Sequence, residues 1–159
     1  MLRLGVIGYG GRIRGIIHGL RVFGVDFEIA AIADPRGEQL KQDCEELKDT
    51  RLYDDADALL DSEALDGALV GTRCSLHTPM AVKVAARKLP LFLEKPVATS
   101  MEQVRALHEA FRDYPSEVVV SFPLRLTSLA LTTKEIIDSG RLGAIEHVQA
   151  WNNVPYGWC

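Results

Sequence analysis

The sequence predicts an α/β fold built on a doubly wound parallel sheet. Between Leu2 and Phe122, apolar stretches of strand length alternate with amphipathic stretches of helix length. This is the order that parallel strands joined by crossover helices require. The first apolar stretch, Leu2–Ile7, is followed at once by a glycine turn, and the second, Phe27–Ala33, is followed at once by an acid, Asp34. Strand, turn, helix, strand and acid in this order are typical of a nucleotide-binding βαβ unit.

The helix between these two strands is predicted by its apolar positions. Ile13, Ile16, Ile17 and Leu20 recur at helical spacing on one face, which is expected to pack against the sheet. Further strands are expected at Arg51–Tyr53, Leu65–Val70, Leu89–Leu93 and Glu117–Phe122. Further helices are expected at Gly37–Lys48 and Asp54–Leu60, at a segment capped by Ser75 that runs to Lys88, and at a segment capped by Ser100 that buries Met101, Val104, Leu107 and Phe111.

The chain changes character after Phe122. Thr127–Ser139 is expected to form a helix that stops at Gly140 and turns inward Leu129, Thr133, Ile136 and Ile137. Ile145–Trp151 alternates like a half-buried strand. A lone strand is not stable in water, so it either joins the edge of the first sheet or begins another sheet. The last nine residues are crowded with aromatic side chains, so we expect the chain to be cut short there; these are Trp151, Tyr156 and Trp158.

The composition is that of an ordinary soluble globular protein. Of the 159 residues, 47% are apolar and 25% charged, and no apolar run approaches the roughly 20 residues of a membrane-spanning helix. Without a signal-peptide pattern, the expected location is the cytoplasm. A net charge of −4 without a basic cluster disfavours nucleic acid and membranes as partners and favours a small molecule. The cysteines and histidines follow no disulfide or metal-ligand spacing, so we expect Cys44, Cys74 and Cys159 to be free thiols.

The glycine turn after the first strand is the first candidate site. Glycine at positions 8 and 10 permits a tight turn and leaves room for a pyrophosphate at the N–H groups of the following helix. The third glycine of the dinucleotide fingerprint is absent, because Ile13 stands in its place. A purely structural turn and a related domain for another ligand, such as coenzyme A, are the alternatives. The candidate cofactor-binding residues of this turn are Gly8, Tyr9, Gly10, Gly11 and Arg12.

The acid that ends the second strand bears on the choice of cofactor. A carboxylate at Asp34 can accept hydrogen bonds from the adenosine ribose hydroxyls, which favours NAD. Arg36 follows two residues later, and an arginine near the ribose can hold the 2′-phosphate of NADP. We therefore expect NAD as the cofactor, with NADP as the alternative.

Several short motifs make the chain similar to one oxidoreductase family. They are Gly5–Gly11, Ala31–Asp34, Gly71-Thr72 followed by His77, Glu94-Lys95-Pro96, and Ile136–Gly143 leading into Ile145–Val148. With these motifs in this order, the chain resembles the Gfo/Idh/MocA oxidoreductases over nearly all of its length. The resemblance implies a dinucleotide-binding Rossmann domain at residues 1–122. It also implies that residues 123–159 begin a truncated sheet domain, which holds the substrate and offers a surface for a homo-oligomer or another partner.

The resemblance implies roles for residues at the ends of the later strands. Lys95 would lie beside the nicotinamide and the substrate and act as the catalytic acid or base, and Glu94 would orient it; a solvated lysine and a strand-capping acid are the alternatives. Thr72 and His77 would contact the cofactor, although a histidine in a first helical turn is often only a capping neighbour. Arg125 matches a family arginine that follows the sixth strand.

Two positions depart from the family pattern. Arg73 stands where a proline usually follows soon after the threonine, and Pro123 replaces a more polar residue near Arg125. The second catalytic group of the family, a histidine or an aspartate of the sheet domain, has no counterpart in this sequence.

The implied function is hydride transfer between the nicotinamide and a hydroxyl or carbonyl group of a sugar-like or cyclitol-like substrate. This chain would hold mainly the nucleotide-binding part of such an NAD(P)-dependent oxidoreductase. The alternative is a non-catalytic nucleotide-binding module or cofactor sensor that needs a partner chain.

Overall fold

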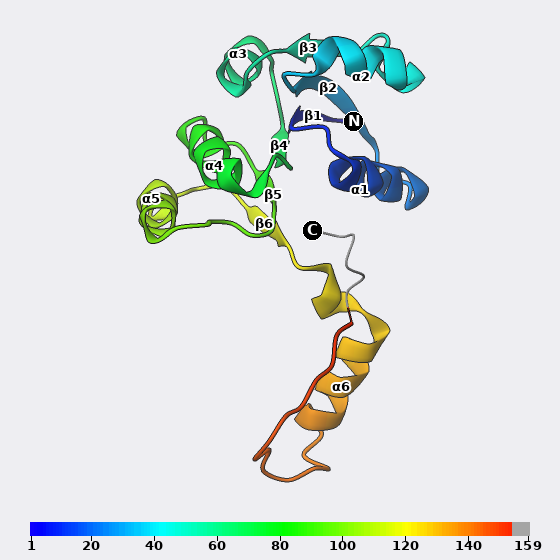
Figure 1. Cartoon of the computed structure of the whole chain (residues 1–159), viewed down its shortest axis with the longest axis vertical. Coiled ribbons are helices and arrows are strands. Elements are labelled where there is room, and N and C mark those ends of the chain that lie inside the picture. The colour runs from blue at the N-terminus through cyan, green and yellow to red at the C-terminus, as the bar shows by residue number, and fades with distance from the viewer. Residues whose placement is uncertain (154–159) are drawn as a thin grey trace. The chain divides into compact units, whose positions relative to one another are not determined.

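The computed structural model describes residues 1–153 and divides the chain into two compact units, Met1–Ser121 and Phe122–Cys159 (Figure 1). The expectations about Tyr156, Trp158 and Cys159 lie outside the described residues. No helix among the described residues is long and apolar enough to cross a membrane.

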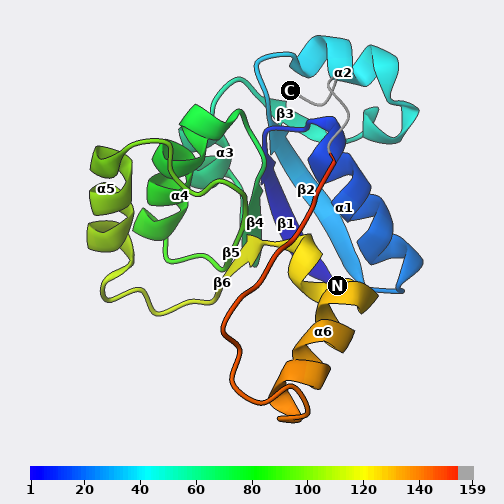
Figure 2. The same cartoon turned by 60° about the horizontal axis from the view of Figure 1, so that its bottom comes forward.

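The first unit is built on a six-stranded parallel sheet in the order β3-β2-β1-β4-β5-β6 (Figure 2). The direction of strand addition reverses between β1 and β4. In open α/β sheets, ligands bind at the carboxyl ends of the strands beside such a point. The predicted doubly wound α/β fold is therefore confirmed. The strands are β1 (Leu2–Ile7), β2 (Phe27–Ala33), β3 (Arg51–Tyr53), β4 (Gly67–Val70), β5 (Leu91–Glu94) and β6 (Val118–Ser121).

Helices cover both faces of this sheet, because neighbouring strand residues point to opposite sides. Val6 packs with α1 and α2, whereas Ile7 packs with α3 and α4. Ile13 and Ile17 are the buried residues of α1, as its apolar spacing predicts. The helices are α1 (Gly11–Val22), α2 (Gly37–Asp43), α3 (Ala56–Ser62), α4 (His77–Ala86) and α5 (Met101–Phe111).

Several helix boundaries differ from the prediction. The expected helix Asp54–Leu60 lies at Ala56–Ser62, and the helix expected to run to Lys88 ends at Ala86. Two further differences come from 3₁₀ turns. The expected helix Gly37–Lys48 is interrupted at Cys44, whose backbone is extended, and continues only as a short 3₁₀ turn. Ser75 does not cap α4, because it lies inside another 3₁₀ turn, and α4 begins at His77. In both places a tight turn takes up residues that a regular helix would have used.

The start of α5 is confirmed, but its buried stripe is wrong in part. Ser100 caps the helix by accepting a hydrogen bond from the Gln103 amide at 3.2 Å. Met101 is 64% exposed and Val104 is also exposed, whereas Leu107 and Phe111 are partly buried against the core. The helix lies outermost, beside α4 (Figure 2), so only part of its apolar face reaches the core.

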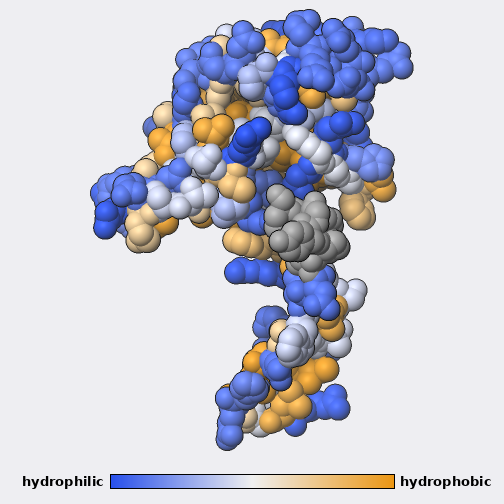
Figure 3. Space-filling model, viewed as in Figure 1, coloured by the Kyte–Doolittle hydropathy of each residue, from blue (hydrophilic) through white to orange (hydrophobic). Residues whose placement is uncertain are grey.

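The second unit contains a 3₁₀ turn at Pro123–Leu126 and α6 (Ser128–Asp138). Gly140 ends the helix with a φ of +72° and donates its amide to the Ile137 carbonyl, as expected. The expected strand Ile145–Trp151 is not formed, because no strand among the described residues pairs with it. The α6 face expected to turn inward is exposed (lower part of Figure 3); it comprises Leu129, Thr133, Ile136 and Ile137.

Candidate cofactor-binding site

A cavity of about 690 Å³ opens at the carboxyl edge of the sheet. It is formed by the residues that follow β1, β2, β3 and β4 and by parts of α3 and α4. The structure brings together five of the predicted site residues here, namely Gly8, Gly10, Asp34, Arg36 and Thr72. The other lining residues are Ile7, Ala33, Pro35, Asp54, Asp55, Ala56, Gly71, Arg73, Leu76, Met80 and Lys83.

Gly8 is the position in the turn that most clearly requires glycine. Its φ is +84°, and a Cβ placed on it would lie 2.8 Å from the Thr72 backbone. The chain therefore passes from β1 to α1 in direct contact with the end of β4. The first N–H groups of α1, from Gly11 onward, have no intrahelical partners. A bare backbone beside a helix N-terminus fits an anionic diphosphate group.

The missing third glycine is compensated by Gly71, the residue directly after the neighbouring strand β4. Ile13 is fully buried, and a Cβ placed on Gly71 would lie 1.9 Å from the Ile13 Cγ1 atom. The isoleucine side chain thus fills the space that Gly71 leaves open at the end of β4. The helix α1 therefore still packs closely against the sheet. The small residue of this contact is Gly71, on the side of the sheet, and not a glycine of the helix.

Asp34 is buried and accepts four hydrogen bonds. Its Oδ1 accepts from the Arg36 backbone amide and Nε, both at 3.0 Å. Its Oδ2 accepts from the Tyr9 amide at 3.0 Å and from the Arg36 Nη2 at 2.8 Å. A carboxylate offers about four acceptor positions, so this group is saturated by the chain itself. Arg36 must turn away before ribose hydroxyls can bond to Asp34.

These bonds decide the charge of the carboxylate. Burial alone would raise the pKa of Asp34, but the hydrogen bonds and the positive charge of Arg36 outweigh it, and the pKa is lowered. Asp34 is therefore an anion at neutral pH, with the exposed Arg36 guanidinium as its counter-ion.

Tyr9 contributes its backbone rather than its side chain to the site. Its ring is buried in the core between the sheet and α1, and its hydroxyl donates to the Glu46 carboxylate at 2.8 Å. Burial, with further contributions from Glu46, raises the pKa of Tyr9 to about 12. The neutral phenol thus fixes the glycine turn against the segment that follows α2.

Arg12, Glu94 and Lys95 lie beside this cavity rather than among its lining residues. Glu94 is buried at the end of β5, and its Oε1 accepts a hydrogen bond from the Arg12 Nε at 3.1 Å. The Lys95 amide donates to the other carboxylate oxygen at 3.2 Å, and the residue itself is exposed. The Arg12–Glu94 ion pair connects the start of α1 to the end of β5, past the end of β4, which lies between β1 and β5 in the sheet.

His77 is also outside the lining of the cavity. It is buried at the start of α4, and both of its ring nitrogens lie within hydrogen-bond distance of carbonyl oxygens of the chain, those of Thr72 and Pro96. Arg125 belongs to the second unit, where its guanidinium lies over the Phe122 ring at 4.7 Å from the centroid.

The cavity contains residues that the sequence motifs did not indicate. Leu76 and Met80 add apolar side chains to the lining, and Arg73 and Lys83 add cations besides Arg36. The spacing of Leu76 and Met80, four residues apart directly after the Gly71-Thr72 turn, is the signal that could have indicated them.

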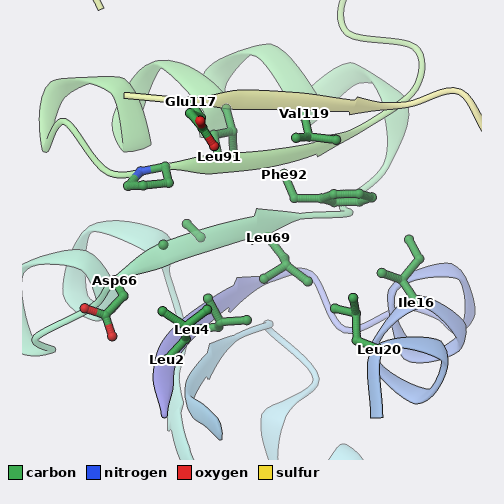
Figure 4. Close-up of a pocket in the computed structure, with 13 residues that line it drawn as sticks. Leu2, Leu4, Ile16, Leu20, Asp66, Leu69, Leu91, Phe92, Glu117 and Val119 are labelled. Carbon is green, nitrogen blue, oxygen red and sulfur yellow. The ribbon is translucent and has the colours of Figure 1, made fainter. Parts of the chain in front are cut away.

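A smaller cavity of about 360 Å³ lies near the amino-terminal ends of β1, β4, β5 and β6, on the face that α1 covers only in part (Figure 4). Apolar side chains such as Leu4, Ile16, Leu69 and Phe92 line it. None of the predicted site residues is among its lining residues, so it is distinct from the candidate cofactor site.

Comparisons with known proteins agree with this geometry. Residues 2–122 match the Gfo/Idh/MocA family model, described as an oxidoreductase family with an NAD-binding Rossmann fold. An inositol 2-dehydrogenase of Pseudomonas fluorescens is 31% identical over 144 residues, which are 89% of this chain and 43% of that protein. A myo-inositol 2-dehydrogenase of Thermotoga maritima is 29% identical, over 89% of this chain and 42% of that protein.

Among solved structures, the WlbA dehydrogenase from Bordetella pertussis in complex with NADH and UDP-GlcNAcA is similar with a TM-score of 0.79 and 25% identity. The match covers 89% of this chain and 43% of that one. The chain thus spans less than half the length of these relatives. Because the family model matches most of the sequence, the chain belongs to the Gfo/Idh/MocA oxidoreductases, and residues 2–122 are its NAD-binding Rossmann domain.

Proposed function

We propose that this chain is the cofactor-binding part of an oxidoreductase that acts on a hydroxyl or carbonyl group of a sugar-like or cyclitol-like substrate. The observation that carries the proposal is the cavity in which Gly8, the first turn of α1 and Asp34 meet. The names of the relatives, which include inositol 2-dehydrogenases, support the class of substrate.

The residues around the cavity fit a dinucleotide. The bare backbone at Gly8 and Gly10 and the N–H groups of α1 would hold the diphosphate. Asp34 would hold the adenosine ribose once Arg36 turns away, and Thr72 would contact the cofactor at the end of β4. When bound, NAD supplies the acceptor or donor of the hydride.

Lys95 is the proposed catalytic residue. It follows β5 directly at the carboxyl edge, is exposed, and carries an ammonium group that can donate a proton to a substrate oxygen. Glu94 would position it, since its carboxylate binds the Lys95 amide and is itself held by Arg12. In any form of the protein that oxidises its substrate, Lys95→Ala should abolish turnover and leave the cofactor bound. Normal turnover of that variant would exclude Lys95 from the mechanism.

The proposal extends to the second unit. Residues 123–159 would begin the sheet domain that holds the substrate and mediates oligomer formation, and Arg125 would reach the cofactor from it. The exposed free thiol of Cys74 favours a cytoplasmic location, because exposed thiols persist in a reducing compartment.

Calorimetric titration of the chain with NADH and NADPH tests the proposal, with coenzyme A as the control ligand. We expect saturable binding of NADH, weaker binding of NADPH and no binding of coenzyme A. Asp34→Ala should weaken NADH binding and lessen the discrimination against NADPH. A folded chain that binds neither dinucleotide, or that prefers coenzyme A, would contradict the proposal.

A further inference from the structure

His77 occupies a position that cofactor contact does not explain. It is the first residue of α4 and only 2% exposed. Its Nδ1 lies 2.7 Å from the Pro96 carbonyl oxygen, and its Nε2 lies 3.0 Å from the Thr72 carbonyl oxygen. The ring therefore stands between the segment that follows β4 and the segment that follows β5.

Both partners of the ring are acceptors only. They are backbone carbonyl oxygens, one from the segment that follows β4 and one from the segment that follows β5. A single buried ring therefore bridges two segments that lie far apart in the sequence.

The two bonds fix the orientation of two peptide groups. In a trans peptide, the carbonyl and the next N–H point in opposite directions. With the Thr72 and Pro96 oxygens held by His77, the N–H groups of Arg73 and Val97 are turned away from it. The neighbouring Thr78 hydroxyl donates to the Val97 carbonyl at 2.8 Å. The first two residues of α4 thus bind two consecutive carbonyls directly after Lys95.

We propose that His77 is a positioning residue that ties the loop carrying Lys95 to the end of β4. It acts on the reaction through that loop and does not contact the cofactor. The consequence for Lys95 rests on the proposed function, whereas the hold of the ring on the loop does not.

NMR of the histidine rings tests the contacts of the ring in the unliganded chain. We expect a His77 ring N–H that exchanges slowly with solvent, because the ring is buried against two carbonyl oxygens. The signal is assigned as the one that persists in His18→Gln, His108→Gln and His147→Gln, whose rings are exposed in the wild type and serve as references. A His77 ring N–H that exchanges as fast as those of the exposed rings would overturn the proposal. Since no nucleotide is present, failure of NAD binding would not affect this result.

Amide hydrogen exchange tests the hold on the loop. We expect His77→Gln to speed exchange at least about tenfold in residues 72–74 and 97–99, and to leave β1 and β2 unchanged. Thr78→Val should affect only the segment after β5, and His108→Gln, on the exposed face of α5, should change neither segment. Unchanged exchange in His77→Gln would overturn the proposal; if that variant does not fold, the ring measurement on the wild type decides.

Kinetics separate positioning from cofactor contact. In a form that turns over substrate, His77→Gln should lower kcat about 10- to 100-fold, because a small displacement of a catalytic group has effects of this size. The KM for NAD should stay unchanged. A rise in KM without a loss in kcat would return His77 to the cofactor site and overturn the proposal.

Discussion

The two halves of the carboxyl edge of the sheet are held together by contacts of different origin. In the half at β1 and β2, Asp34 is bound by Arg36, two residues away, and by the Tyr9 amide, 25 residues away in the same βαβ unit. In the half at β4 and β5, Glu94 is bound by Arg12, 82 residues away, and Pro96 is contacted by His77, 19 residues away. The first contacts form within one βαβ unit and the turn after it, whereas the Glu94 contact exists only when α1 and β5 are in their final places.

This difference separates recognition of the cofactor from placement of the catalytic group. The side-chain contacts of Asp34 all lie within one βαβ unit and the turn that follows it. The position of Lys95 depends on Arg12 from α1 and on His77 from α4. Perturbations of packing are therefore expected to affect the β4–β5 half first, and variants can test this.

The largest effect is expected at Gly8, where the two halves touch. Gly8→Val combines a backbone strain of about 1–3 kcal/mol at positive φ with a Cβ that would lie 2.8 Å from the Thr72 backbone. We expect NADH affinity to fall at least about 100-fold in calorimetric titration. Gly19→Ala, which meets no atom within 4 Å on α1, is the matched control and should bind normally. Tight NADH binding by Gly8→Val would show that the turn does not carry the diphosphate.

The next largest effect is expected where Ile13 fills the space beside Gly71. Gly71→Ala should lower the free energy of unfolding by about 1–3 kcal/mol through overpacking. Ile13→Ala should lower it by about 2–5 kcal/mol through the cavity it creates. In urea unfolding, the double variant should be more stable than the sum of the two losses predicts, because the new methyl group occupies part of that cavity. Strict additivity would mean that the two side chains do not share one space.

The outcome of the sequence predictions follows the same division. The strands, the glycine turn and Asp34 are predicted from local patterns. The structure shows a doubly wound sheet with Gly8, Gly10 and Asp34 at its carboxyl edge. The sequence does not explain why Ile13 replaces the third glycine of the fingerprint, because the residue that makes room for it, Gly71, follows β4, 58 positions later. A missing glycine can thus be compensated by a partner that no local pattern shows.

The expectations that were wrong concern burial that depends on distant partners. The apolar spacing at Met101 and Val104 correctly predicts a helix, but not how far that helix lies from the core. The alternation at Ile145–Trp151 predicts a strand, yet a strand needs a neighbour that the described residues do not supply. Local patterns therefore predict the type of element better than its surroundings.

A smaller effect should distinguish the two arginine–carboxylate pairs. Arg12→Ala leaves Glu94 buried with only the Lys95 amide as donor, so the unfolding free energy should fall by about 1–3 kcal/mol. Arg36→Ala leaves Asp34 with two backbone donors, and Arg36 is more than half exposed, so the loss should be within about 1 kcal/mol. Equal losses in urea unfolding would contradict the division between a local and a long-range half.

The smallest effect is expected in the acid dependence of stability. Because the pKa of Asp34 is lowered in the folded protein, its stabilising contribution is complete above its unfolded pKa of about 3.9. The contribution should be lost as the pH falls through the lower folded pKa. The difference in unfolding free energy between wild type and Asp34→Asn, followed by urea titration from pH 7 to pH 2, should therefore shrink only below about pH 4.

Arg36→Ala sharpens that measurement, since it removes the cation that opposes the effect of burial on Asp34. The acid-sensitive range of this variant should move to higher pH than that of the wild type. If the range does not move, the two backbone amides of Tyr9 and of position 36 are sufficient to hold the carboxylate in its charged form. Arg36 would then be free to leave Asp34 at little electrostatic cost, which is what binding of the ribose hydroxyls requires.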